Sequence, residues 1–550
     1  MIETDLPDQF LYARQGPWPQ PSPSHPLICA DEVLHIPQME ELLFNQTIGL
    51  RYLKARMGYP AYAAQYAASV AGWTGVTPER FDTIMLDTIY TRFRTPLHPD
   101  ETEALAKAFA EDPEILAELS SGAWYKYDFT AMDMVKPIPG TYSAGTKVFI
   151  RFDSDEDSAT GSTRIISVRD TFIHRDDSSW GIANCYALQG AAYHVLFVVH
   201  PAIHFPMDSI NAITKTSVPM GHPLFQLFLP HSTYSLPLDN AVLESSMSVV
   251  NNNAQGTRFD PLTADAYNLK LLFGAGYNGV TAEDNGPQYL PGAYPRYNYM
   301  KPHMYRAPGS KNSDPRDHLF NSEYGRWLGA YYEVFLEFCR AIATEIKADK
   351  SQLDYVKHWA KYCHNHVHGF PMPAEVAGEV EGHEDTLAEV MAIYTWNNSV
   401  SHGGDHWSFA NQVSPVEKCL RIRRAPPTRR DEAPVDNAAT EGGQIFSPND
   451  MQRAALCQYM FFQAWAIEPN LAETQYAFTN PKLLAASMEF HAGLKKVNET
   501  FCKVLPEPVV QGGDSMAITT CMPLEPIPHP DKPGEFLVPY AKTLPQSIQY

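Results

Sequence analysis

The sequence predicts a mainly α-helical protein with one small β-hairpin. Apolar residues recur at helical spacing over most of the 550 residues, and prolines interrupt this pattern at intervals. β-Branched and aromatic residues are instead concentrated in Lys147–Phe152 and Arg164–Arg169, which flank an acidic, glycine-containing turn at Asp153–Gly161. The two patterns together indicate helices throughout the chain and a hairpin at this one place.

The helical part is divided by prolines. Pro60, Pro78 and Pro113 interrupt the region from Glu40 to Ser121, so several packed helices are expected there. The clearest helical segments are Ala61–Ala71, Glu103–Leu119, the apolar stretch from Trp180 past His204, Glu323–Ile346, Glu384–Trp396, Pro448–Ile467 and Pro481–Lys496.

Residues 1–38 differ from the rest in composition. They are rich in proline and aromatic residues, as in Gly16-Pro-Trp-Pro-Gln-Pro-Ser-Pro, which favours extended backbone on a surface. We expect an extended N-terminal arm over residues 1–38 and a single helical domain over residues 39–550, because no internal repeat or clear linker divides the latter.

Charge and cysteine content limit the classes of partner. Lys and Arg number 42 against 63 Asp and Glu, a net charge of −21, which disfavours binding to nucleic acid and points to a small-molecule partner. The eight cysteines are scattered singly, which is typical of reduced thiols. No signal-peptide pattern and no uninterrupted apolar run of membrane-spanning length are present, so the sequence predicts a cytoplasmic protein without stable membrane insertion.

Two histidine pairs have the spacing of metal ligands. His200 and His204 are four residues apart in an apolar segment, so on a helix both imidazoles project from the same face. The alternative is that they are two hydrogen-bonded core histidines. Pro201 removes a backbone hydrogen bond, so the helix is expected to be distorted or to end here.

His402 and His406 repeat this spacing after a second apolar helix. Four neutral imidazoles suit iron, manganese or zinc. Gly403 and Gly404 would allow a close approach, or would merely weaken the helix near its boundary. Asp405 is expected either to be exposed to solvent or to lie behind the metal ligands and help to orient them.

Other chemical motifs are weak or missing. The histidines of His364–His368 are two residues apart, which suits a strand or loop and makes a metal site there improbable. The sequence contains no GxSxG elbow, no Walker loop, no GxGxxG fingerprint after a predicted strand and no HExxH motif. Hydrolase, kinase and dehydrogenase functions therefore have no support.

The residues around the first pair follow a specific order: Trp180, then Tyr193-His194, then His204, and eighteen residues later His222-Pro-Leu-Phe-Gln-Leu-Phe-Leu-Pro-His231. This order resembles the core of the lipoxygenase family, and its last segment is similar to the family's HPIYKLLxPH signature.

The resemblance extends over about residues 120–550. Tyr127–Phe152 resembles the β-ribbon before the family's first ligand helix, and His368–Trp396 with the following His402 resembles its second ligand helix. The end of the chain, Leu544-Pro-Gln-Ser-Ile-Gln-Tyr550, is similar to the family's terminal IPNSISI. The resemblance implies a lipoxygenase-like helical catalytic domain with a small β-sheet, lacking the β-barrel domain that precedes it in plant and animal members.

The resemblance also implies the metal ligands. His204, His402, His406 and the terminal carboxylate of Tyr550 fall on ligand positions of the family, and His200 is the fourth histidine by inference. The family usually has five-residue spacing before His204, which falls on Val199. One non-haem iron ion is implied, with manganese possible, and no catalytic group beyond a metal-bound hydroxide.

The implied activity is a dioxygenase reaction on a small apolar molecule and O2. Such an enzyme abstracts hydrogen from an activated C–H of the polyunsaturated fatty acid type and adds O2 to give a hydroperoxide, a step of lipid and oxylipin metabolism. Val195, Val242 and Ser246 depart from the family's usual residues at positions near the substrate. They leave open an oxygenase or oxidase acting on a different small molecule, and a metal-free binding protein with this fold remains a further alternative.

The basic stretch Arg421–Arg430 has two interpretations. It could attract a substrate carboxylate or a membrane, but a solvated run of charges is the expected one.

Overall fold

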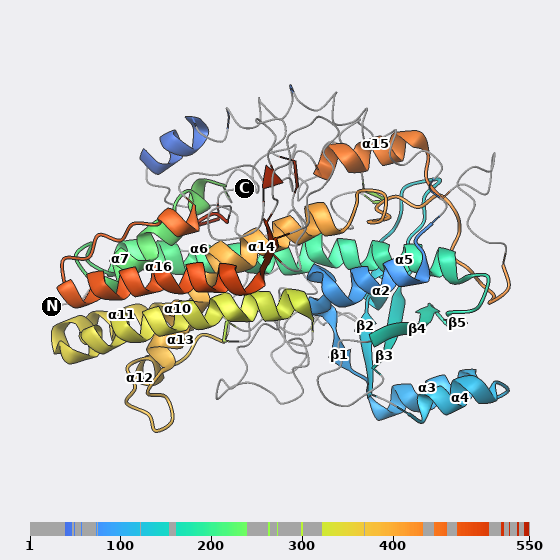
Figure 1. Cartoon of the computed structure of the whole chain (residues 1–550), viewed down its shortest axis with the longest axis horizontal. Helices are drawn as coiled ribbons and strands as arrows, with labels where there is room; N and C mark the ends of the chain where they lie inside the picture. The colour runs from blue at the N-terminus through green and yellow to red at the C-terminus, as the bar shows by residue number, and fades with distance from the viewer. Residues whose placement is uncertain are drawn as a thin grey trace.

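The structure of the protein is a computed structural model, which describes residues 39–46, 49, 57, 73, 75–121, 123–152, 161–238, 262–264, 272, 299–300, 322–367, 369–432, 445–458, 470–504, 519–521, 527–528, 536–537 and 544–548. Long helices run side by side across the molecule, and a small antiparallel sheet lies towards one end (Figure 1). The predicted fold class, mainly α with a small β-sheet, is confirmed.

The sheet has five antiparallel strands in chain order: β1 (Thr95–Pro96), β2 (Ala123–Asp128), β3 (Thr146–Phe152), β4 (Gly161–Val168) and β5 (Thr171–His174). Its centre is the predicted hairpin of β3 and β4, in a register that places Val148 opposite Ile166. Both side chains are buried and belong to the main hydrophobic core. The outer strands β1 and β5 are too short to show an alternating pattern in the sequence.

One helical rod forms the centre of the molecule. α5 (Trp180–His194) continues through a π-helical turn, Val195–Val199, into α6 (His200–Ser217). The two helices lie in line across the middle of Figure 1. The stretch Trp180–Val199 is long and apolar enough to cross a membrane, but it is wholly buried inside the protein, so its composition is that of a core helix.

A second helical rod is made of shorter pieces. α13 (Thr386–Trp396) leads through a π-helical turn, Asn397–Ser401, into the six residues of α14 (His402–Trp407), and a further π-helical turn follows at Ser408–Gln412. The first of these π turns packs against α6. The two rods therefore meet where each carries its histidine pair.

Most of the other described helices pack around these two rods (Figure 1). The other described helices are α2 (Pro78–Asp87), α3 (Pro99–Ala108), α4 (Pro113–Leu119), α7 (Pro223–His231), α10 (Glu323–Ala348), α11 (Lys350–His366), α12 (Pro373–Val376), α15 (Pro448–Cys457) and α16 (Pro481–Phe501). Of these, α3 and α4 lie beyond the sheet, with which they share a small hydrophobic cluster (Figure 1). α10 packs on both α13 and α16, and α11 packs on α6. Two further pairs of short strands are β6 (Cys502–Val504) with β7 (Thr519–Cys521), and β8 (Ile527–Pro528) with β9 (Phe536–Leu537).

The helix boundaries follow local capping. The expected break at Pro113 is confirmed, because a new helix, α4, begins there. α3 begins at Pro99, earlier than the predicted Glu103, because the Glu101 carboxylate accepts a hydrogen bond from the His98 backbone N–H at 3.2 Å. The predicted arm over residues 1–38 and the predicted helix 61–71 lie outside the described residues.

The basic stretch is only partly the solvated run that was expected. Arg429 is exposed, in agreement with that interpretation. Arg421 is buried instead, and its Nε donates to the carbonyl oxygen of Leu262 at 2.8 Å. Arg430 makes a bidentate contact with the carboxylate of Asp177, in which Nε donates to Oδ2 at 2.7 Å and Nη2 donates to Oδ1 at 3.0 Å. The expectation therefore holds for Arg429 and Arg430, which are both exposed, and fails for Arg421, whose buried guanidinium hydrogen-bonds to a distant part of the chain.

Candidate metal centre

The structure brings the four predicted histidines together between α6 and α14. The Nε2 atom of His204 lies 3.0 Å from Nε2 of His200 and 3.0 Å from Nε2 of His402. Ring nitrogens of His200, His402 and His406 all lie within 4.8 Å of one another. The two pairs, nearly 200 residues apart in the sequence, therefore face a common point.

The spacing of these nitrogens fits a single metal ion. Two imidazole nitrogens that bind one ion at about 2.1 Å and at a right angle to each other are separated by about 3 Å. The Nε2 separations around His204 have this value. The cluster of described residues is thus of the size and donor type that a divalent ion of iron or manganese needs.

Burial favours the neutral form of two of these imidazoles, those of His200 and His204. The pKa of His204 is lowered to about 4 by burial, and that of His200 is lowered well below its usual value by burial and by the neighbouring His204 and His406. His402 is fully buried, while His200 is partly exposed. Neutral imidazoles are the form that binds a metal, so His200 and His204 need no deprotonation near neutral pH.

The backbone of the first rod explains how four-residue spacing serves this site. The π-helical turn Val195–Val199 ends immediately before His200, and ordinary α-helix runs from there through His204. In an α-helix, residues i and i+4 lie on one face. Pro201 lies inside the continuous rod, and the expected distortion of the helix occurs just before it as the π turn.

The glycines of the second rod accommodate close neighbours, as one of the two alternatives predicted. A Cβ atom built on Gly403 would lie 2.8 Å from Cδ of Pro545 and 3.0 Å from a methyl carbon of Leu544. One built on Gly404 would lie 2.7 Å from a ring carbon of Trp327. A larger residue at either position would therefore displace a packed side chain.

Asp405 is not exposed, so that alternative is wrong. It is 1% exposed, and its Oδ1 accepts hydrogen bonds from Nε and Nη2 of Arg92 at 3.0 and 2.7 Å. It also accepts one from the hydroxyl of Tyr324 at 2.6 Å. Burial raises the pKa of Asp405, and Arg92 opposes that shift. No motif in the sequence marked Arg92 or Tyr324, because their partner lies more than 80 residues away along the chain.

The described end of the chain, residues 544–548, is buried beside α14. Leu544, Ser547 and Ile548 are fully buried, and the Ser547 hydroxyl donates to the carbonyl oxygen of Thr233 at 2.9 Å. Nδ1 of His231 donates to the carbonyl oxygen of Gln546 at 2.7 Å. The predicted ligand Tyr550 lies outside the described residues, two positions beyond the last described one.

The remaining predicted residues are not brought to the cluster by the described part of the chain. Val195 is buried at the start of the π turn. Val242 and Ser246 lie outside the described residues. His364 lies on α11, where its Nδ1 donates to the carbonyl oxygen of Phe370 at 2.7 Å, so the expected strand or loop is a helix there.

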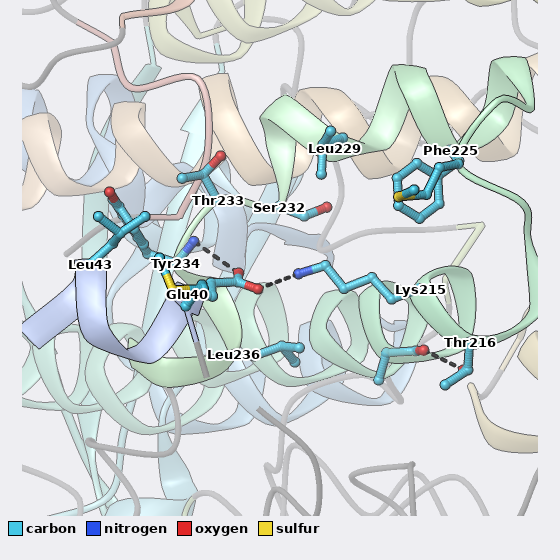
Figure 2. A pocket seen from close by; sticks show the side chains of 13 residues that line it. Glu40, Leu43, Lys215, Thr216, Phe225, Leu229, Ser232, Thr233, Tyr234 and Leu236 are labelled. Carbon is cyan, nitrogen blue, oxygen red and sulfur yellow. Dashed lines mark hydrogen bonds and ion pairs between the residues drawn. The ribbon is translucent and has the colours of Figure 1, made fainter. Parts of the chain in front are cut away.

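A separate pocket of about 500 Å³ opens at the other end of α6 (Figure 2). It lies between residues 39–46, α6 and α7, and its side chains are mostly apolar. Figure 2 shows Lys215 reaching Glu40, with Nζ 2.6 Å from the carboxylate. None of the four histidines is among the described residues that line this pocket, so it is distinct from the candidate metal centre.

Comparison with solved structures identifies the fold as that of the lipoxygenase catalytic domain. The manganese lipoxygenase of Gaeumannomyces graminis superimposes with a TM-score of 0.60 at 14% identity, over 93% of this chain and 91% of that one. A lipoxygenase variant in anaerobic complex with arachidonate gives a TM-score of 0.64 at 15% identity, over 93% of this chain and 75% of the other.

A calcium-dependent 11R-lipoxygenase is similar with a TM-score of 0.59 at 13% identity. The match covers 86% of this chain, which spans only 65% of the length of that protein. No protein-family model and no curated protein sequence matches the chain. The resemblance found in the sequence is thus confirmed at the level of the fold, which is what these comparisons show.

Proposed function

We propose that the protein is a non-haem metal dioxygenase in which His200, His204, His402 and His406 bind one iron or manganese ion. The observation that supports this most strongly is the pair of 3.0 Å Nε2 separations around His204, inside a fold shared with lipoxygenases. Buried polar side chains usually hydrogen-bond to the backbone or to water, whereas here the Nε2 atoms of His200, His204 and His402 face one another.

The terminal carboxylate of Tyr550 is proposed as the fifth ligand. Its support is the buried course of residues 544–548, which pack against Gly403 one residue after His402. An anionic oxygen ligand suits iron and manganese and would offset part of their charge in a buried site.

The proposed reaction follows from the donor set. An iron or manganese ion held here would take up one electron from a weak C–H bond as its proton leaves, and would return the electron, with a proton, to the peroxyl group formed when O2 adds to the carbon, so that substrate plus O2 balances as one hydroperoxide. The protein's own contribution is to hold four imidazoles in place and to exclude water, since three of the four histidines are buried.

Polyunsaturated fatty acids are the proposed substrate class. The proposed role of the protein is accordingly in lipid and oxylipin metabolism. One structural neighbour was solved in complex with arachidonate, which supports this class. A second candidate is an oxygenase or oxidase acting on another small molecule, favoured by the apolar, buried Val195 at a position where the lipoxygenase family usually has a polar side chain.

The domain organisation and location complete the proposal. Residues 39–550 form one catalytic domain, with residues 1–38 as an arm, in a cytoplasmic protein. The four described free cysteines, all buried, agree with a reducing compartment.

Metal analysis and O2 uptake together test this proposal. Purified protein is expected to contain about one iron or manganese ion per chain and to consume O2 with arachidonate or linoleate. Chelator-treated protein that stays folded is the matched control. Bound metal without uptake on any fatty acid favours the second candidate, and a folded protein that binds neither metal contradicts the proposal.

A further inference from the structure

The helix that bears His402 and His406 has little rigidity of its own. α14 is six residues long, lies between two π-helical turns and contains two adjacent glycines. Glycine is among the weakest helix formers because it loses most backbone freedom on folding. The orientation of both imidazoles therefore has to be fixed from outside the helix.

The 3₁₀ turn after α2, residues 89–93, contacts this rod at three places. Nη2 of Arg92 donates to the Ser401 hydroxyl at 2.9 Å, and its Nε and Nη2 donate to Asp405 at 3.0 and 2.7 Å. The backbone N–H of Ile89 donates to the Ser408 hydroxyl at 2.8 Å. These contacts hold the rod just before, within and just after α14.

The three contacted positions lie on one face of the rod, since they are spaced by four and three residues. His402 and His406 each follow a contacted residue by one position, about 100° further round the helix axis. These contacts to residues next to His402 and His406 fix the rotation of the helix that presents the imidazoles and its position along the axis.

We infer that Arg92 and Asp405 are positioning residues that set the geometry of His402 and His406 at the metal. This inference rests on the proposed function. A buried ion pair adds little net stability, because desolvation offsets the attraction between the charges. The planar guanidinium instead gives directional contacts to two groups at once, which a smaller apolar pair could not provide.

The test is Mn²⁺ binding by the full-length chain after metal removal, measured by calorimetry and by the electron paramagnetic resonance spectrum of the bound ion. The main variant is the neutral pair Arg92→Gln/Asp405→Asn, which leaves no uncompensated charge. We expect Mn²⁺ affinity about 10- to 100-fold weaker, the range seen for groups that orient metal ligands, and an altered spectrum. Wild-type affinity with an unchanged spectrum would overturn the inference.

A matched control is Arg164→Gln/Glu118→Gln, which removes another bidentate ion pair, with Nε 2.9 Å from Oε2, between the sheet and α4. It is expected to bind Mn²⁺ as the wild type does, and an equal loss of affinity would overturn the inference in favour of a general effect of stability.

If circular dichroism shows that the neutral-pair variant is unfolded, Arg92→Lys takes its place. Lysine keeps the positive charge but lacks the planar guanidinium with its several donors, so Mn²⁺ affinity is still expected to fall about 10-fold. An unchanged affinity would overturn the inference. Wild-type protein that binds no Mn²⁺ and no iron overturns the proposed function itself, whereas wild-type binding with unaffected variants overturns only the inference.

Discussion

The two histidine pairs have the same spacing but are supported in different ways. The first pair lies at the start of α6, inside a helical rod that runs from Trp180 to Ser217. The second pair lies on six residues between π turns. The first rod is interrupted by one π turn and the second by two, and the second also receives contacts beside its histidines from the 3₁₀ turn, from Tyr324 and from the C-terminal segment. Equal motifs in a sequence can therefore depend on very different numbers of distant residues.

Replacing single ligands is expected to have the largest effect. His402→Ala should lower metal affinity more than about 100-fold, beyond the range for groups that only orient ligands, and abolish turnover. His200→Ala should be milder, because His200 is partly exposed and water can take its place. Metal content after dialysis and O2 uptake measure both. Equal retention of metal by the two variants would contradict the comparison between the pairs.

Filling the glycines of α14 should cost stability. An alanine usually stabilises a helix relative to glycine by about 1 kcal/mol. Gly404→Ala is expected to do the opposite, destabilising by about 1–3 kcal/mol through overpacking, because its Cβ would lie 2.7 Å from the Trp327 ring. Gly221→Ala is the control, since nothing lies within 4 Å of its Cβ. Urea unfolding compares the two, and a stabilised Gly404→Ala would show that the contact is not tight.

Acidification should lower the free energy of unfolding through His231, the residue that hydrogen-bonds to the C-terminal segment. Burial lowers the pKa of His231, which donates to Gln546, to about 4. The unfolded chain therefore takes up a proton on this residue first as the pH falls, and stability decreases from about pH 6.5 downwards to about pH 4. From about pH 7 to about pH 5 the contribution of this residue amounts to about 2 kcal/mol.

The measurement is the free energy of unfolding at both pH values for wild type and His231→Gln. Glutamine can keep one hydrogen bond without titrating, so the wild type should lose about 2 kcal/mol more than the variant. Identical losses would mean that His231 is accessible to protons in the folded state.

The smallest effect is expected far from the cluster. Lys215→Ala breaks an ion pair with Glu40 whose two side chains are 20% and 15% exposed. Both side chains line an open pocket, where water can solvate the carboxylate left behind, so the loss is about 1 kcal/mol, and metal content should not change. A loss of metal in this variant, measured by elemental analysis, would show that the pocket in Figure 2 and the histidine cluster are linked.

The sequence predicted what depends on local periodicity. The β3–β4 hairpin, the helix break at Pro113 and the positions of the two histidine pairs all follow from patterns within a few residues. It could not predict the partner of Asp405, because Arg92 lies 313 residues away and a single arginine carries no periodic signal. The two interpretations of Gly403 could likewise be separated only by knowing that Pro545 packs on it.

The π turns were also beyond the sequence. Pro201 indicated a distortion, but not that it would take the form of an extra residue in the turn Val195–Val199. The matching π turn at Asn397–Ser401 contains no proline at all. Such turns arise when tertiary packing favours a wider helix, and they are frequent at functional sites.

The central claim is that four imidazoles share one ion. Pulsed electron paramagnetic resonance on the Mn²⁺-loaded protein counts the nitrogen atoms bound to the metal directly. Four imidazole nitrogens in the wild type, falling to three in His200→Ala, are the predicted result. Three or fewer in the wild type would contradict the four-histidine centre.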